Sequence, residues 1–157
     1  FRRYYHRARW TSDGVPAAER DDCAAGRRRV CAIAGLESRG FLFGAPMAYN
    51  LHKAFIPIRK QGKLPRATSR MSYELEYGME TIEVHRDDIK PGMKIVVVDD
   101  LIATGGTLEA AVHLLEQLGA KVVKVVCLLE LKGLHGRDPH QTCPAETVVA
   151  SRGSKQG

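Results

Sequence analysis

The sequence predicts an α/β fold with a mostly parallel central sheet flanked by helices. Three short apolar runs indicate buried strands, at residues 30–34, 95–98 and 122–129. Two stretches with helical spacing of apolar residues, 38–51 and 106–118, alternate with these runs. Strands that alternate with helices form right-handed β-α-β units, and such units produce a parallel sheet.

The first predicted helix follows the first strand, and Ser38 is a suitable N-cap for it. Its apolar face is expected to consist of Phe41, Leu42, Ala45, Ala48, Tyr49 and Leu51. A second short strand is expected at residues 54–58, and the second predicted helix is closed by Gly119.

The middle of the chain predicts a departure from the parallel pattern. Residues 59–70 are basic and contain Gly62 and Pro65, which favours a mobile loop. Residues 71–75 and 81–85 are expected to pair as a small antiparallel ribbon around Gly78.

Composition bounds the class of protein. The 157 residues are 44% hydrophobic and 27% charged, which is ordinary for one globular domain, and no apolar stretch is long enough to span a membrane. The net charge is +6, but residues 1–29 alone contribute +4 of it. We therefore interpret residues 1–29 as a divergent basic N-terminal segment before a domain at 30–157. We expect no nucleic-acid partner, because no nucleic-acid-binding motif accompanies the charge.

Four cysteines, Cys23, Cys31, Cys127 and Cys143, form no C-x-x-C pair and have no histidine pair at zinc spacing. We expect them to be reduced, as in a cytoplasmic protein.

The loop after the strand at 95–98 carries the strongest functional signal. Asp99 and Asp100 directly follow this strand, and the turn Thr104-Gly105-Gly106-Thr107 then opens a helix. A helix N-terminus with glycines and threonine hydroxyls suits a phosphate group. Two carboxylates beside a phosphate would repel it unless a sugar lay between them, and carboxylates accept hydrogen bonds from vicinal hydroxyls. The run is neither a Walker A loop nor a dinucleotide fingerprint.

These residues resemble the phosphoribosyl pyrophosphate motif of type I phosphoribosyltransferases. Two more stretches narrow the resemblance to the adenine phosphoribosyltransferases: Gly35-Leu36-Glu37-Ser38-Arg39-Gly40-Phe41, and the basic segment from Ile58 to Pro65 followed by Tyr73-Glu74-Leu75-Glu76-Tyr77-Gly78. The similarity covers residues 31–137. It implies a type I phosphoribosyltransferase-like fold.

The resemblance also implies a role for each matching position. Asp99 and Asp100 are expected to hold the ribose hydroxyls. The 5′-phosphate is expected at Ala103, Thr104, Gly105, Gly106 and Thr107. The pyrophosphate is expected against Glu37, Ser38 and Arg39, with Arg59, Lys60 and Lys63 neutralising its charge. The peptide bond at the Glu37-Ser38 position is often cis in this family.

Catalysis is expected from Glu76 and Tyr77, on a loop that closes over the site. The implied reaction joins adenine to phosphoribosyl pyrophosphate and gives AMP and pyrophosphate. The implied cofactor is Mg²⁺, held mostly by substrate oxygens rather than by a dedicated protein site. The family also implies a homodimer. Two alternatives stay open, a transferase for another purine base and a regulator that binds phosphoribosyl pyrophosphate without chemistry.

The sequence matches the family least in the segment that recognises the base. Adenine enzymes usually begin with a hood segment that stacks on the base, and Phe1-Arg2-Arg3 does not continue in that pattern. Leu131 is the remaining candidate for packing against the purine.

Overall fold

The structure, a computed structural model, describes residues 30–75, 78–132 and 145–152, with side chains described as far as Leu129. The elements follow in the order β1 (Ala32–Leu36), α2 (Arg39–Asn50), β2 (Ala54–Lys60), β3 (Thr68–Leu75), β4 (Gly78–His85), the 3₁₀ turn η2 (Arg86–Asp88), β5 (Lys94–Ile102), α3 (Gly106–Gln117), β6 (Lys121–Lys132) and β7 (Ala145–Arg152).

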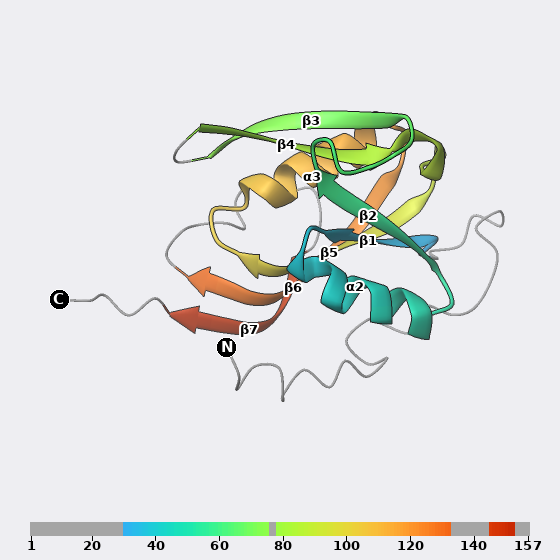
Figure 1. The fold of residues 1–157 in the computed structure, drawn as a ribbon. Helices are drawn as coiled ribbons and strands as arrows, with labels where there is room; N and C mark the ends of the chain where they lie inside the picture. The colour runs from blue at the N-terminus through green and yellow to red at the C-terminus, as the bar shows by residue number, and fades with distance from the viewer. Residues whose placement is uncertain (1–29, 76–77, 133–144, 153–157) are drawn as a thin grey trace.

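One sheet of seven strands runs through the described residues, in the order β3-β4-β2-β1-β5-β6-β7 (Figure 1). The pairs β2–β1, β1–β5, β5–β6 and β6–β7 are parallel, whereas β4 pairs antiparallel with both β3 and β2. The predicted fold class, a mostly parallel sheet with an antiparallel ribbon, is therefore confirmed. The edge strand β7 was not predicted.

Among the described elements, α2 covers one face of the sheet and α3 the other, which explains why residues 95–98 of the central strand β5 are all apolar. Ile95 and Val97 pack into the cluster that contains the buried face of α3, whereas Val96 and Val98 pack into the cluster that contains α2. All four side chains are at most 1% exposed. Because successive residues of a strand point to opposite faces, a strand covered on both sides needs apolar residues throughout.

The predicted apolar face of α2 is right at Ala48, which is buried, and wrong in most other positions. Leu42 and Tyr49 are 56% and 80% exposed, and the helix instead buries Gly40, Phe43, Gly44, Met47 and Ala48. The two glycines are required by close packing: a Cβ at Gly40 would lie 2.7 Å from the backbone oxygen of Val98, and one at Gly44 would lie 3.0 Å from the ring of Phe55. Hydropathy gives little weight to glycine, so the sequence does not reveal the buried face that Gly40 and Gly44 form together with Phe43 and Met47.

The antiparallel ribbon is confirmed, with Leu75 of β3 paired to Gly78 of β4 and φ at +101° for Gly78. The loop predicted at 59–70 is shorter than expected. Arg59 and Lys60 complete β2, and β3 begins at Thr68. β2 and β3 bury few side chains, so hydropathy alone does not reveal that both ends of this stretch are strand.

Cys31 is disulfide-bonded, so the expectation of four reduced cysteines is wrong at this position, whereas Cys127 is free and buried. Among the described helices, none has the length and apolar character needed to cross a membrane.

Candidate active site

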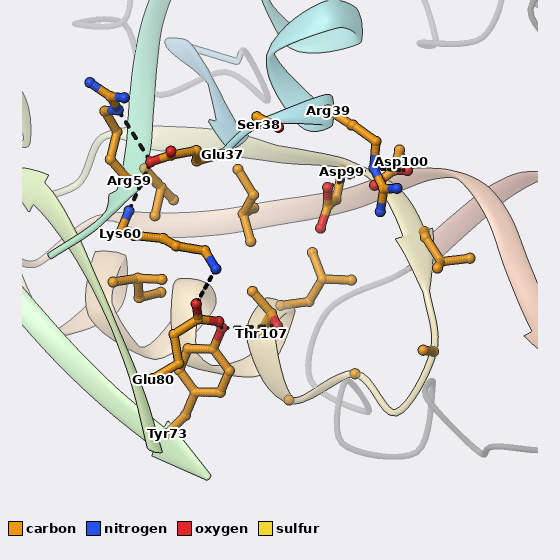
Figure 2. Close-up of a pocket in the computed structure, with 18 of the residues that line it drawn as sticks. Glu37, Ser38, Arg39, Arg59, Lys60, Tyr73, Glu80, Asp99, Asp100 and Thr107 are labelled. Atoms are coloured by element: carbon orange, nitrogen blue, oxygen red, sulfur yellow. Dashed lines mark hydrogen bonds and ion pairs between the residues drawn. The ribbon is translucent and has the colours of Figure 1, made fainter. Parts of the chain in front are cut away.

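A cleft of about 470 Å³ lies at the carboxyl ends of β1, β2 and β5 (Figure 2). Ligands of parallel α/β sheets bind at this edge. The three motif stretches named in the sequence, at 35–41, 58–65 and 99–107, each contribute residues to it. The polar side chains on its walls come from Glu37, Ser38, Arg39, Arg59, Lys60, Tyr73, Glu80, Asp99, Asp100, Thr104 and Thr107.

The floor of the cleft is the end of β5 and the turn into α3. β5 runs to Ile102, so Asp99 and Asp100 belong to the strand itself rather than to the loop after it. Gly105 is the N-cap of α3 and has φ +85°, a left-handed conformation that favours glycine. The first N–H groups of α3 have no partner within the helix, so this end of the cleft attracts an anion.

The adjacent carboxylates of Asp99 and Asp100 lie in different surroundings. Burial, together with the charge of Asp100, raises the pKa of Asp99 to about 7, even though the backbone N–H of Asp100 donates to Asp99 Oδ1 at 2.8 Å. Asp100 is 8% exposed, and its Oδ2 lies 2.7 Å from Nε of Arg39. Near neutral pH Asp99 is therefore partly protonated, and a bound cation would displace that proton.

This pKa predicts a stability effect. Because folding raises the pKa of Asp99 above its unfolded value near 4, the folded state favours the protonated form, and stability falls as pH rises from about 4 to 7. Asp99→Asn is expected to raise the melting temperature at pH 8 by roughly 3–6 °C, equivalent to about 1–2 kcal/mol, and to change it little at pH 4. Calorimetric melting at both pH values measures this, and an equal shift at the two would contradict it.

The wall from β1 to α2 is centred on Glu37, whose peptide bond to Ser38 is cis, as the resemblance implied. Glu37 Oε2 accepts from Arg59 Nε at 3.2 Å and from the backbone N–H of Lys60 at 3.0 Å, and its Oε1 pairs with Lys63 Nζ. Burial raises the pKa of Glu37, but these contacts outweigh it and hold the pKa below the usual value. Glu37 therefore gathers the cations of the basic segment.

The wall from the β3–β4 ribbon contains two residues that sequence reasoning missed. Tyr73 Oη donates to Glu80 Oε2 at 2.7 Å and accepts from Thr107 Oγ1 at 3.1 Å, while Glu80 also pairs with Lys60 Nζ (Figure 2). Burial, with the carboxylates of Glu80 and Asp99, raises the pKa of Tyr73 to about 12, so its hydroxyl stays protonated. The alternation of side chains along β3 was the available signal, since it places Tyr73 and Met71 on one face.

The structure brings most of the predicted site residues together. Those that line the cleft are Glu37, Ser38, Arg39, Arg59, Lys60, Asp99, Asp100, Ala103, Thr104, Gly105, Gly106 and Thr107. Lys63 lies outside the lining and reaches it through Glu37. Glu76 and Tyr77 lie outside the described residues, and Leu131 belongs to β6 with a side chain that is not described.

Comparison with known sequences agrees with this arrangement. Residues 17–151 match the phosphoribosyl transferase domain family. The adenine phosphoribosyltransferase of Lachnoclostridium phytofermentans is 66% identical over 121 residues, which cover 77% of this chain and 70% of that protein. The enzyme of the same name from Agathobacter rectalis is 56% identical with the same coverage.

Solved structures show the same likeness. The adenine phosphoribosyltransferase of Rhodothermus marinus superimposes with a TM-score of 0.77 at 45% identity, over 80% of this chain and 72% of that one. The Saccharomyces cerevisiae enzyme, in complex with an imino-altritol bisphosphate and adenine, gives 0.75 at 41% identity, over 78% and 69%. The chain belongs to the phosphoribosyltransferase family and is an enzyme of that class. Within the family it groups with the adenine phosphoribosyltransferases.

Proposed function

We propose that this chain transfers the phosphoribosyl group of phosphoribosyl pyrophosphate to adenine, releasing AMP and pyrophosphate for purine salvage. The observation that carries the proposal is one cleft that combines a carboxylate pair, a helix N-terminus and a set of cations. In the reaction a purine nitrogen forms a bond to ribose C1 while the C1–O bond breaks. The electron pair of that bond leaves with pyrophosphate, and the purine nitrogen loses its proton.

The ribose 5-phosphate half of the substrate fits the floor of the cleft. Asp99 and Asp100 accept hydrogen bonds from the two ribose hydroxyls. The 5′-phosphate occupies the turn at Ala103, Thr104, Gly105, Gly106 and Thr107, where the N-terminus of α3 and the threonine hydroxyls donate to it. A bound phosphate then takes the Thr107 hydroxyl, which donates to Tyr73 in the free chain.

The pyrophosphate half fits the opposite wall. Ser38 and Arg39 stand at the start of α2, and Arg39 offers a planar guanidinium for a bidentate contact. Arg59, Lys60 and Lys63 supply further positive charge, with Glu37 holding Arg59 and Lys63 in place in the free chain. These cations stabilise the charge that develops on the leaving group.

Chemistry at the base falls to the segment that joins the ribbon strands. Glu76 handles the purine proton or stabilises positive charge at C1, and Tyr77 covers the site when the ribbon closes. Leu131 on β6 packs against the purine. Tyr73 and Glu80, on the two strands that flank Glu76 and Tyr77 in the sequence, line the cleft, which supports the assignment.

Mg²⁺ fits this donor set. Within the described part of the chain no cluster of three or more His, Cys, Asp or Glu side chains could hold a metal alone. The carboxylates of Asp99 and Asp100 nevertheless offer the oxygen ligands that Mg²⁺ prefers, with the rest coming from the diphosphate and water. When bound, the ion neutralises charge on the departing pyrophosphate.

Turnover with each purine base tests the function. Release of pyrophosphate in the presence of phosphoribosyl pyrophosphate and Mg²⁺ is measured with adenine, hypoxanthine and guanine. A kcat/KM at least about tenfold higher for adenine is expected. Preference for another base would assign the chain to a different purine transferase, and binding without turnover would make it a regulator.

We also infer a homodimer and a cytoplasmic location. The exposed Leu42 and Tyr49 on α2 support a subunit contact, which light scattering at micromolar concentration tests. Phosphoribosyl pyrophosphate is highly charged and cannot cross a bilayer unaided, so an enzyme that consumes it works in the compartment where it is made.

A further inference from the structure

A buried carboxylate lies behind the cleft, outside the residues that line it. Glu83 of β4 is 0% exposed, and it pairs in register with Arg59 of β2 and Arg70 of β3. An ionised carboxylate in such a place is costly unless every lone pair finds a donor. The role of Glu83 can therefore be inferred from the groups that donate hydrogen bonds to it.

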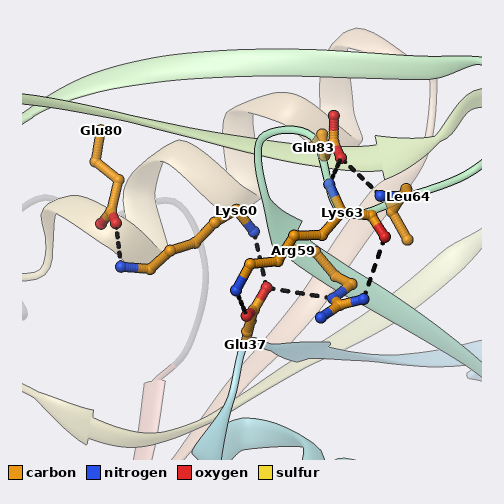
Figure 3. Close-up of polar contacts among 7 residues, drawn as sticks. All are labelled: Glu37, Arg59, Lys60, Lys63, Leu64, Glu80 and Glu83. Atoms are coloured by element: carbon orange, nitrogen blue, oxygen red, sulfur yellow. Dashed lines mark hydrogen bonds and ion pairs between the residues drawn. The ribbon is translucent and has the colours of Figure 1, made fainter.

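The two oxygens of Glu83 hold two different segments, and Figure 3 shows the contacts of one of them with Lys63 and Leu64. Oε1 accepts from the backbone N–H groups of Lys63 and Leu64, at 2.9 and 3.0 Å. Oε2 accepts from Thr68 Oγ1 at 3.3 Å and from Arg70 Nε at 3.1 Å. Oε1 thus fixes the turn that follows β2, while Oε2 ties β4 to β3.

The turn held by Oε1 leads directly to the cleft. The backbone oxygen of Lys63 accepts from Arg59 Nη1 at 3.2 Å, and Arg59 Nε reaches Glu37 at 3.2 Å. Lys63 Nζ pairs with the other oxygen of Glu37. The peptide unit between Lys63 and Leu64 donates to Glu83 and accepts from Arg59. The side chain of Lys63 supplies the second cation at Glu37 (Figure 3).

We propose that Glu83 is a positioning residue for the pyrophosphate end of the substrate, acting through the turn at 61–64 on Arg59 and Lys63. The inference rests on the proposed function, because it assumes that these cations meet pyrophosphate. A lysine on a free turn loses backbone and side-chain entropy when it binds, whereas a turn fixed beforehand has already lost part of it. Loss of Glu83 should therefore weaken substrate binding more than it slows the chemical step.

The test compares Glu83→Met with Arg70→Met. The first keeps the buried volume but accepts no hydrogen bond, so it releases the turn. The second removes a partner of Oε2 and leaves the turn attached. Glu83→Met is expected to raise KM for phosphoribosyl pyrophosphate about tenfold, with kcat and KM for adenine changed less than about threefold. Arg70→Met is expected to leave all three within about twofold.

A double-mutant cycle with Lys63→Ala separates positioning from general destabilisation. If Glu83 acts through the turn, Glu83→Met raises KM less in the Lys63→Ala variant than in the wild type, and the remaining rise reflects Arg59, which still binds the backbone oxygen of residue 63. Fully multiplicative effects, or an equal rise in KM for Arg70→Met, would overturn the proposal.

Amide hydrogen exchange on the wild-type chain keeps the test open if Glu83→Met does not fold. The N–H groups of Lys63 and Leu64 lie in a turn at the surface, yet they are expected to be protected by the buried acceptor. Exchange at the rate of an unfolded chain would refute the anchoring. A wild-type chain that fails to bind phosphoribosyl pyrophosphate overturns the proposed function and this inference together, whereas wild-type binding with an unchanged Glu83→Met variant overturns this inference alone.

Discussion

Replacing Asp99 and Asp100 together by asparagine is expected to lower the affinity for phosphoribosyl pyrophosphate by at least about 100-fold. Charge-assisted hydrogen bonds contribute roughly 1.5–3 kcal/mol each, so losing two of them corresponds to about this factor. The fold should survive, because a neutral side chain at position 99 avoids the burial and the Asp100 charge that raise the pKa of Asp99, which offsets the loss of the ion pair between Asp100 and Arg39. The variant should therefore be folded and yet unable to hold the sugar.

Titration calorimetry with phosphoribosyl pyrophosphate and Mg²⁺ measures the loss. A matched control is the adjacent pair Asp87 and Asp88 in η2, which carries the same charge outside the cleft. The double asparagine variant of that pair should bind within about twofold of the wild type. Unchanged affinity for the Asp99 and Asp100 variant would rule out the ribose assignment.

Glu76→Gln is expected to lower kcat about 100-fold while the affinity for phosphoribosyl pyrophosphate stays within about twofold. A residue that moves a proton in the transition state contributes roughly 10²–10⁴ in rate, and it contributes little to ground-state binding. The strands that flank Glu76 in the sequence supply Tyr73 and Glu80 to the cleft, which supports this role for Glu76.

Steady-state kinetics at saturating adenine separates kcat from KM. Glu74→Gln serves as the control, because Glu74 is an exposed acid on the same ribbon that does not line the cleft. Its kcat should stay within about twofold of the wild type. If Glu76→Gln instead raises KM with a normal kcat, Glu76 only helps to hold the substrate.

The sequence predicted those parts of the molecule that local chemistry determines. The buried run at 95–98 and the Thr-Gly-Gly-Thr turn needed no tertiary information, because burial on both faces and a helix N-terminus each leave a local pattern. The predicted end of this strand, at Val98, is too early, because β5 continues to Ile102. Two carboxylates favour a loop in the sequence, but in the fold they lie on the strand where it borders the cleft.

Features that depend on contacts between distant residues could not be predicted. The buried face of α2 is determined by the close approach of Val98 and Phe55 to its glycines. The spacing of apolar residues within α2 carries no information about these contacts. Glu83 looks like an ordinary strand carboxylate in the sequence, and only the path of the turn after β2 shows what it binds. Tyr73 and Glu80 meet Thr107 and Lys60 only because the ribbon folds back over the carboxyl edge of the sheet.

The ion pairs of the free cleft have a consequence for discrimination among cellular phosphates. Four cations are paired with three carboxylates of the chain: Arg39 with Asp100, Lys60 with Glu80, and both Arg59 and Lys63 with Glu37. A single phosphate ion gains little by replacing one of these built-in counter-ions, because it breaks an existing pair for each contact it makes. A ligand that carries several phosphates on one sugar replaces several counter-ions in one binding event. The abundant simple phosphates of a cell should therefore compete poorly for a site rich in positive charge.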